Sequence, residues 1–354
     1  MVFPERCLTI SFAEGRSRSE KRLNRMSVFG SFKLRVSTAF AFSPLTSECP
    51  FRNLTTASFR ATPSPLFMNR PFQGEAVNLV DLAPTILAAL GVSLVVGIMN
   101  VVNFAHGELY ILAGYFSYLF ASALGVNFVL AMVMAVGLVF VLGLLIEYLL
   151  IRPTYGNDMY SLILTFILSI VLQNAYLLIF GPYPNKPPLW VSGATDVFGL
   201  FLYGNQRLAA LAAGAAVIAV IFVVIKKTWF GRIIRATSQD REMAELNGVD
   251  TTRLNMLSFG LGCALAAAAG VILAPVFPVT PGAGVPVALT AFVVVVLGGM
   301  GSLWGCVVGG LTLGLVENLG AAFISSGYKN VFGFVILILV LLVRPAGLFG
   351  RAKV

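Results

Sequence analysis

Two long segments without charge restrict what this chain can fold into. Residues 254–316 contain no Asp, Glu, Lys or Arg, and neither do residues 109–146. A helix crosses the bilayer core with about 20 apolar residues, so each segment is long enough for more than one crossing. Only 11% of all residues are charged and 58% are hydrophobic, which leaves too few polar side chains to cover a soluble domain. We therefore predict an all-α fold, a polytopic membrane bundle of about 8–9 transmembrane helical segments.

The apolar segments can be placed individually. Glycine and proline interrupt several of them, for example at Pro84, Gly97 and Gly299, so some helices are expected to be short or interrupted. The predicted helices span residues 82–101, 107–124, 126–151, 160–181, 208–225, 255–274, 287–300, 303–322 and 330–343.

The basic residues are concentrated before these segments. The net charge is +9, but residues 1–78 hold 11 Lys and Arg against 5 Asp and Glu, whereas the rest of the chain holds 13 against 10. This distribution indicates membrane topology rather than nucleic-acid binding. Residues 1–78 are expected to be a disordered extension. An alternative is that the assigned start lies upstream of the true start, which would then be Met26 or Met68. Residues 79–354 form the transmembrane domain.

Orientation follows from the remaining basic residues. Placing the 226–254 loop inside also places Arg152 and the C-terminal Arg344, Arg351 and Lys353 inside, ten basic residues against three outside. The C-terminus is therefore predicted to be cytoplasmic. Nine crossings would then place the basic N-terminal segment outside, and the sequence does not resolve this conflict.

A polar cluster stands between two apolar segments at residues 103–108. It contains Asn103, Glu108 and the only histidine of the chain, His106. Such groups at the edge of hydrocarbon cost free energy unless they are hydrogen-bonded or contact a solute. Three interpretations stay open: a structural network that joins two helices, a contact with a translocated solute, or a gate. Glu317, in an otherwise apolar segment, is expected to be the most deeply placed acid, as a tie between helices or as a transport residue.

The 226–254 loop is the most informative polar segment. Ala236, Asp240, Met243, Ala244 and Leu246 are spaced to form one short amphipathic helix. That helix is expected to end at Gly248, because glycine readily adopts the left-handed cap conformation. Such a helix suits docking into a groove of another protein, and the alternative is a helix that lies on lipid or on its own membrane domain.

The sequence lacks the motifs of several enzyme and metal-binding classes. The sequence contains no GxxxxGK[ST], HExxH or GxSxG pattern, and its four cysteines show no CxxC spacing. We therefore expect no ATPase site, no cofactor and no metal site in this chain, and Cys263 and Cys306 are interpreted as small packing residues.

Three segments resemble landmarks of the LivH-type permeases of branched-chain amino acid ABC transporters. They are residues 95–110 (VVGIMNVVNFAHGELY), 235–250 (RATSQDREMAELNGVD) and 291–319 (AFVVVVLGGMGSLWGCVVGGLTLGLVENL). The C-terminal LLVRPAGLFGR, residues 341–351, is also similar to that family's ending.

The resemblance implies a multi-pass permease of the bacterial inner membrane that itself is not an enzyme. Its implied partners are a second homologous permease, two cytoplasmic ATPase subunits and a periplasmic solute-binding protein, besides membrane lipid. The 226–254 loop would be the segment that the ATPase receives. Its matching positions are Arg235, Ala236, Asp240, Ala244 and Gly248.

Two other functions remain open at this stage. The same kind of permease could carry urea, short amides or other amino acids. A stand-alone channel or ion-coupled carrier is the second, although such a protein has no need for a charged loop of this kind.

Overall fold

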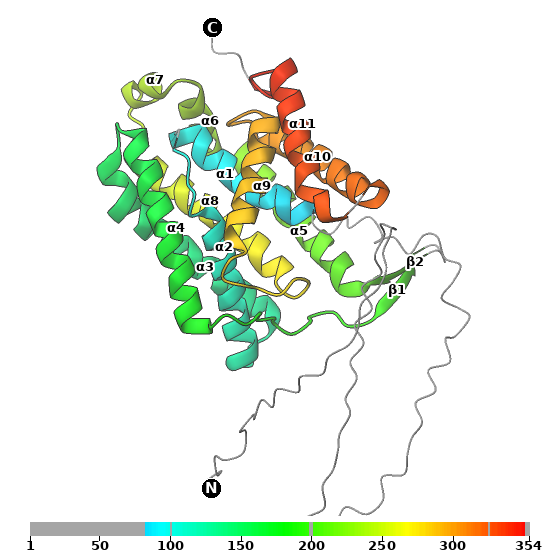
Figure 1. Ribbon diagram of the computed structural model, residues 1–354. Coiled ribbons are helices and arrows are strands. Elements are labelled where there is room, and N and C mark those ends of the chain that lie inside the picture. The colour runs from blue at the N-terminus through cyan, green and yellow to red at the C-terminus, as the bar shows by residue number, and fades with distance from the viewer. Residues whose placement is uncertain (1–81, 100, 198–200, 325, 351–354) are drawn as a thin grey trace, which may run out of the picture. The chain divides into compact units, whose positions relative to one another are not determined.

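The computed structural model describes residues 82–99, 101–197, 201–324 and 326–350 (Figure 1). The predicted extension, residues 1–78, lies outside the described residues. A helix covers every apolar segment named above, which confirms the all-α membrane bundle. The α-helices are α1 (Leu82–Met99), α2 (His106–Tyr118), α3 (Phe128–Ile146), α4 (Asp158–Phe180), α5 (Asn205–Lys227), α6 (Trp229–Gln239), α7 (Arg241–Leu246), α8 (Thr251–Leu273), α9 (Gly284–Gly298), α10 (Leu303–Phe323) and α11 (Lys329–Val343).

Shorter elements complete the fold. π-helical turns at Leu119–Ala123 and Glu147–Ile151 follow α2 and α3, and short 3-10 turns lie at Arg152–Thr154 and Ser326–Tyr328. Before α5, strands β1 (Ala194–Val197) and β2 (Phe201–Gly204) pair as an antiparallel hairpin. Within the described residues, six helices are long and apolar enough to cross a membrane, and the apolar helices at Gly284–Gly298 and Val331–Val343 are shorter.

Burial separates two central helices from the outer ones. The apolar windows of α1 and α8 are 89% and 78% buried, whereas the other four long spans are at most 28% buried. The outer helices expose large apolar side chains, for example Val133 on α3 and Leu178 on α4. An apolar surface of this extent is stable only when lipid covers it.

Glycines bring the central helices into close contact. A Cβ on Gly91 of α1 would lie 2.6 Å from the carbonyl oxygen of Gly262 on α8, and one on Gly107 of α2 would lie 2.0 Å from that of Gly284 on α9. Because glycine has no Cβ, the backbones can touch. This close van der Waals packing holds the helices together in lipid, where the hydrophobic effect does not drive them into contact.

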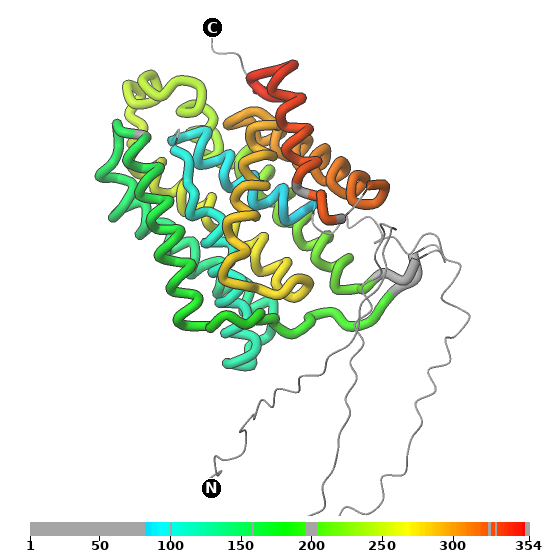
Figure 2. The backbone as a smooth tube through the Cα atoms, viewed as in Figure 1, coloured from blue at the N-terminus to red at the C-terminus, as the bar shows by residue number. Residues whose placement is uncertain are grey.

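The 226–254 loop and the end of α11 lie at the same end of the helical bundle (Figures 1 and 2). The segment after α11 folds back onto the C-terminus of α9, where the amides of Leu348 and Phe349 donate to the carbonyl oxygens of Leu297 and Gly298 at 2.9 and 3.0 Å. These carbonyls have no partner within their own helix, so the C-terminal segment caps α9.

Candidate functional site

The first helix of the 226–254 loop, α6, folds back onto the end of α5. Thr228 begins α6, and its hydroxyl oxygen accepts a hydrogen bond from the amide of Gly231 at 3.2 Å. Gly231 permits the turn, because a Cβ there would lie 2.1 Å from the carbonyl oxygen of Ile225. The half-buried Arg235 donates to that same carbonyl oxygen at 2.6 Å. Arg235 therefore fixes α6 to the last turn of α5 through a carbonyl at the helix end.

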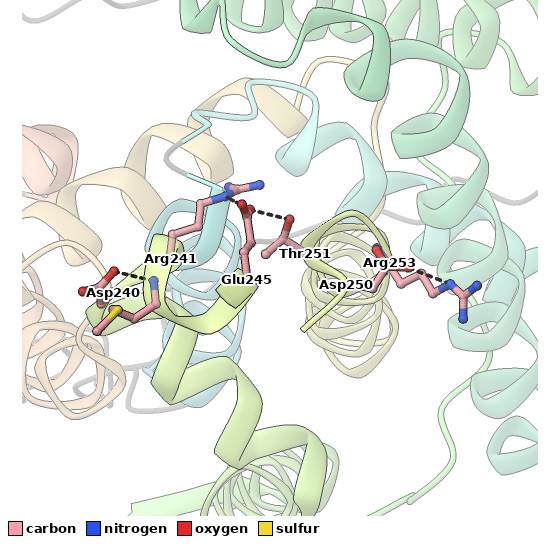
Figure 3. Close-up of polar contacts among 7 residues, drawn as sticks. Asp240, Arg241, Glu245, Asp250, Thr251 and Arg253 are labelled. Carbon is pink, nitrogen blue, oxygen red and sulfur yellow. Dashed lines mark hydrogen bonds and ion pairs between the residues drawn. The ribbon is translucent and has the colours of Figure 1, made fainter. Parts of the chain in front are cut away.

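The prediction of one continuous helix across residues 236–246 is wrong, because the chain turns at Asp240. The Asp240 backbone is extended, with φ −150° and ψ 107°, and ends α6. Its carboxylate then accepts a hydrogen bond from the amide of Met243 at 3.0 Å and begins α7 (Figure 3). Aspartate is favoured at this position since its oxygen satisfies an amide that the first helical turn leaves unpaired.

Much of this loop is not covered by the chain itself. Ala244 is buried, whereas Ala236 and Asp240 are exposed. The large apolar side chains of α7, Met243 and Leu246, are 57% and 81% exposed. The loop thus presents apolar and charged groups side by side.

Gly248 ends α7 as predicted, in the left-handed conformation. Its φ is +83°. The amide of Gly248 donates to the carbonyl of Glu245 at 2.9 Å, and the amide of Val249 donates to that of Ala244 at 3.1 Å. These two bonds form a Schellman cap. A Cβ on Gly248 would meet nothing within 4 Å, so the backbone conformation alone favours glycine.

Side chains tie α7 to the start of α8 (Figure 3). Glu245 Oε1 accepts from the Thr251 hydroxyl at 2.8 Å and lies 3.3 Å from Arg241 Nε. The hydrogen bonds from Thr251 and Arg241 hold the pKa of Glu245 below its usual value, so this carboxylate is charged at neutral pH. Asp250 begins α8 by accepting from the amide of Arg253 at 3.0 Å, and its carboxylate pairs with that guanidinium at 2.9 Å.

The polar cluster at residues 103–108 comes together at the start of α2. Asn103 Oδ1 accepts a hydrogen bond at 3.0 Å from the backbone amide of Ala105. His106 Nε2 lies 3.1 Å from the carbonyl oxygen of Ala88 on α1. The Glu108 side chain is fully buried against Gly284 of α9, where a Cβ would lie 2.5 Å from the carboxyl carbon. These contacts join α2 to two other helices.

Glu317 lies elsewhere, at a pocket of about 300 Å³. Lys329 from the start of α11 lines the same pocket. The other lining residues are Pro84, Thr85, Ala88, Tyr110, Ile111, Gly114, Gly270, Leu273, Ala274, Phe277, Pro278, Val279, Ala283, Pro286, Val287 and Thr290. The wall is therefore mostly apolar, with one acidic and one basic side chain.

The expectation that Glu317 is the most deeply placed acid is wrong. Glu317 is half-buried, whereas Glu108 and Glu147 are fully buried. Sequence reasoning missed Glu147, which lies in the π-helical turn after α3 and accepts a hydrogen bond from the Tyr155 hydroxyl. A signal was present, since Glu147 is a single acid in an apolar segment. π-Helical turns are frequent at functional sites.

The fold and these sites define a multi-pass helical membrane protein with a pocket between its helices and an exposed helical loop. The family model described as branched-chain amino acid transport system, permease component, matches residues 77–341. The chain belongs to this permease family, which confirms the resemblance noted from its sequence. It is a transport component and a multi-pass protein of the inner membrane.

Named relatives cover most of the chain. It is 36% identical to the high-affinity branched-chain amino acid transport system permease protein LivH of Escherichia coli K12 and to that of Salmonella typhimurium, over 80% of this chain and 97% of each relative. It is 35% identical to the permease protein BraD of Pseudomonas aeruginosa, over 79% of this chain and 96% of that relative. No solved structure matches.

Proposed function

We propose that this permease carries branched-chain amino acids across the bacterial inner membrane, powered by ATP hydrolysis in partner subunits. The observation that carries the proposal is the match to relatives named for this transport over 97% of their length. The sequence has no P-loop of its own, so the ATP hydrolysis that powers it would take place in another chain.

We place the contact with the ATPase at the 226–254 loop. The exposed Met243 and Leu246 of α7 would enter a groove of that partner. The residues that shape this surface are Arg235, Ala236, Asp240, Ala244 and Gly248, of which Arg235, Asp240 and Gly248 fix the backbone. A second permease and a periplasmic binding protein complete the assembly. The end of α11 lies at the same end of the bundle as the loop, which supports a cytoplasmic C-terminus.

The pocket supports the same cargo. A branched-chain amino acid carries an ammonium group, a carboxylate and an apolar side chain. Glu317 would attract the ammonium group and Lys329 the carboxylate, while Ala88, Ile111 and Val287 offer an apolar wall. The volume of about 300 Å³ is at the lower end of the range for small-molecule sites, which fits a small solute.

Uptake by reconstituted vesicles tests the function. Vesicles that hold this permease with its partner permease, ATPase and binding protein are given labelled leucine or labelled urea, with and without ATP. Leucine uptake that requires ATP is the expected result. Uptake of urea in place of leucine would refute the proposed cargo. Leucine uptake without ATP would refute ATP as the energy source.

The pocket is tested with Glu317→Gln and Lys329→Met in the same vesicles. Each variant removes one charge from the lining, so leucine uptake should fall about tenfold, the effect of losing roughly 1.4 kcal/mol of solute stabilisation. Lys186→Met, an exposed lysine in the connection before β1, is the matched control. Uptake as in the wild type by both pocket variants would exclude this pocket from the path.

A further inference from the structure

A buried acid lies where α3 ends, next to the start of α8. The Glu147 side chain is fully buried, and its carboxylate accepts a hydrogen bond from the Tyr155 hydroxyl. Burial raises the pKa of the Tyr155 phenol well above its usual value, so Tyr155 stays protonated and acts as the donor. A buried carboxylate costs free energy unless such a donor is held in place, so whatever positions Tyr155 also controls Glu147.

The next member of this chain of contacts is Asn255, one turn into α8 and 1% exposed. In the amide orientation that satisfies both groups, its nitrogen donates to the carbonyl oxygen of Thr251 at 3.2 Å and its oxygen accepts from Arg241 Nη2 at 3.2 Å. The Asn255 side chain also lies beside the Tyr155 hydroxyl. Asn255 is thus placed between the buried pair at the end of α3 and the first residue of α7.

Arg241 belongs to the exposed surface of the loop. Its side chain is 42% exposed, and its Nε lies 3.3 Å from Glu245 Oε1, which accepts from Thr251 at 2.8 Å (Figure 3). Arg241 therefore contacts α7 with one part of its guanidinium and α8 with the other. Polar side chains therefore extend from the exposed loop to the neighbourhood of a buried acid of the membrane domain.

We propose that Arg241, Asn255 and Tyr155 are positioning residues that transmit movement of α7 to Glu147 at the end of α3. The backbone between α7 and α8 contains Gly248 and could absorb a displacement of α7 by itself. The series of side chains removes that freedom, because a shift of α7 would pull Arg241 from Asn255 and leave buried polar groups unpaired. This inference rests on the proposed docking of an ATPase at the loop.

The test compares leucine transported with ATP hydrolysed in vesicles that hold the complete set of subunits. Asn255→Leu and Tyr155→Phe should keep the ATP hydrolysis that loaded binding protein stimulates, while leucine transported per ATP falls about fivefold. The double variant should lose no more than either single variant, because both interrupt one series. Matched controls are Asn174→Leu, an exposed asparagine on α4, and Tyr148→Phe, an exposed tyrosine beside Glu147.

The outcomes separate this inference from the function on which it rests. If both variants keep the wild-type ratio of leucine to ATP, the transmission role is refuted while the importer stands. If hydrolysis and transport fall in parallel, the residues only maintain the fold, which also refutes it. Tyr155→Phe keeps the ring and removes only the hydroxyl, so it gives a folded protein even if Asn255→Leu, at a buried position, does not. ATP-independent uptake by the wild type would instead refute the proposed function.

Discussion

Single residues shape the loop surface mainly through the backbone. Asp240 turns the chain between α6 and α7, and Gly248 ends α7 with φ +83°. Neither residue depends on a packed side chain, since Asp240 is exposed and nothing lies within 4 Å of a Cβ built at Gly248. The shape of this surface therefore depends on the backbone conformation at two positions and not on a buried side-chain contact.

Gly248→Val should weaken coupling without affecting insertion. A β-branched residue in the left-handed region costs about 1–2 kcal/mol, so the end of α7 would refold and displace Met243 and Leu246. ATPase stimulation by loaded binding protein in vesicles should fall severalfold. Gly248→Asn is the control, because asparagine tolerates this conformation, and it should retain most of the stimulation. Equal loss in both variants would contradict the backbone argument.

At the scale of elements, two kinds of contact hold the helices. Inside the bundle, glycines let α1, α2, α8 and α9 touch through their backbones. At the loop, a single long side chain, Arg235, joins α6 to the carbonyl end of α5. The first kind is sensitive to one added methyl group, and the second to loss of one charged donor.

Gly107→Ala should destabilise the bundle. The new Cβ would lie 2.0 Å from the carbonyl oxygen of Gly284, so α2 and α9 would have to separate, at about 1–3 kcal/mol. Gly137→Ala on α3 is the matched control, because a Cβ there meets nothing within 4 Å. Thermal unfolding in detergent measures the difference. A midpoint raised in both variants would show that the higher helix propensity of alanine, and not this contact, decides the effect.

Arg235→Glu should release α6 from α5 while the membrane helices stay assembled. The substitution removes a charged donor worth about 1.5–3 kcal/mol and puts a carboxylate beside the carbonyl of Ile225. Stimulated ATP hydrolysis should decrease at unchanged expression. Arg232→Glu reverses an exposed charge on the same helix, over the ring of Trp229, and should have the smaller effect. The reverse order would exclude Arg235 as the anchor.

At the scale of the whole membrane domain, one end carries both the loop and the end of α11 (Figure 1). Basic residues gather at this end, including Lys226, Lys227, Arg232 and Arg344. Positive residues favour the cytoplasmic side, so the two features point to the same orientation.

Labelling of single cysteines tests that orientation. With Cys7 and Cys49 replaced by Ser, Leu246→Cys should react with a membrane-impermeant maleimide only after the inner membrane is opened, and Tyr183→Cys should react in intact spheroplasts. Both side chains are exposed, at 81% and 79%, so access and not burial decides the result. The buried Cys263 and Cys306 should stay unlabelled in folded protein. Reaction of Leu246→Cys in intact spheroplasts would show that the loop is not cytoplasmic.

The sequence by itself determined the helices, because an uncharged apolar segment in lipid satisfies its backbone only as a helix. It also determined the family, the left-handed Gly248 and the proximity of Asn103, His106 and Glu108, which follow from local sequence. The tertiary structure decided which helices are central, since lipid and protein interior are both apolar and α1 shows no polar face. It alone decided that Glu108 and Glu147 are buried more deeply than Glu317, and that Arg241 contacts Asn255 beside Tyr155. Those contacts join residues far apart in the chain, where only the packing of helices sets the distance.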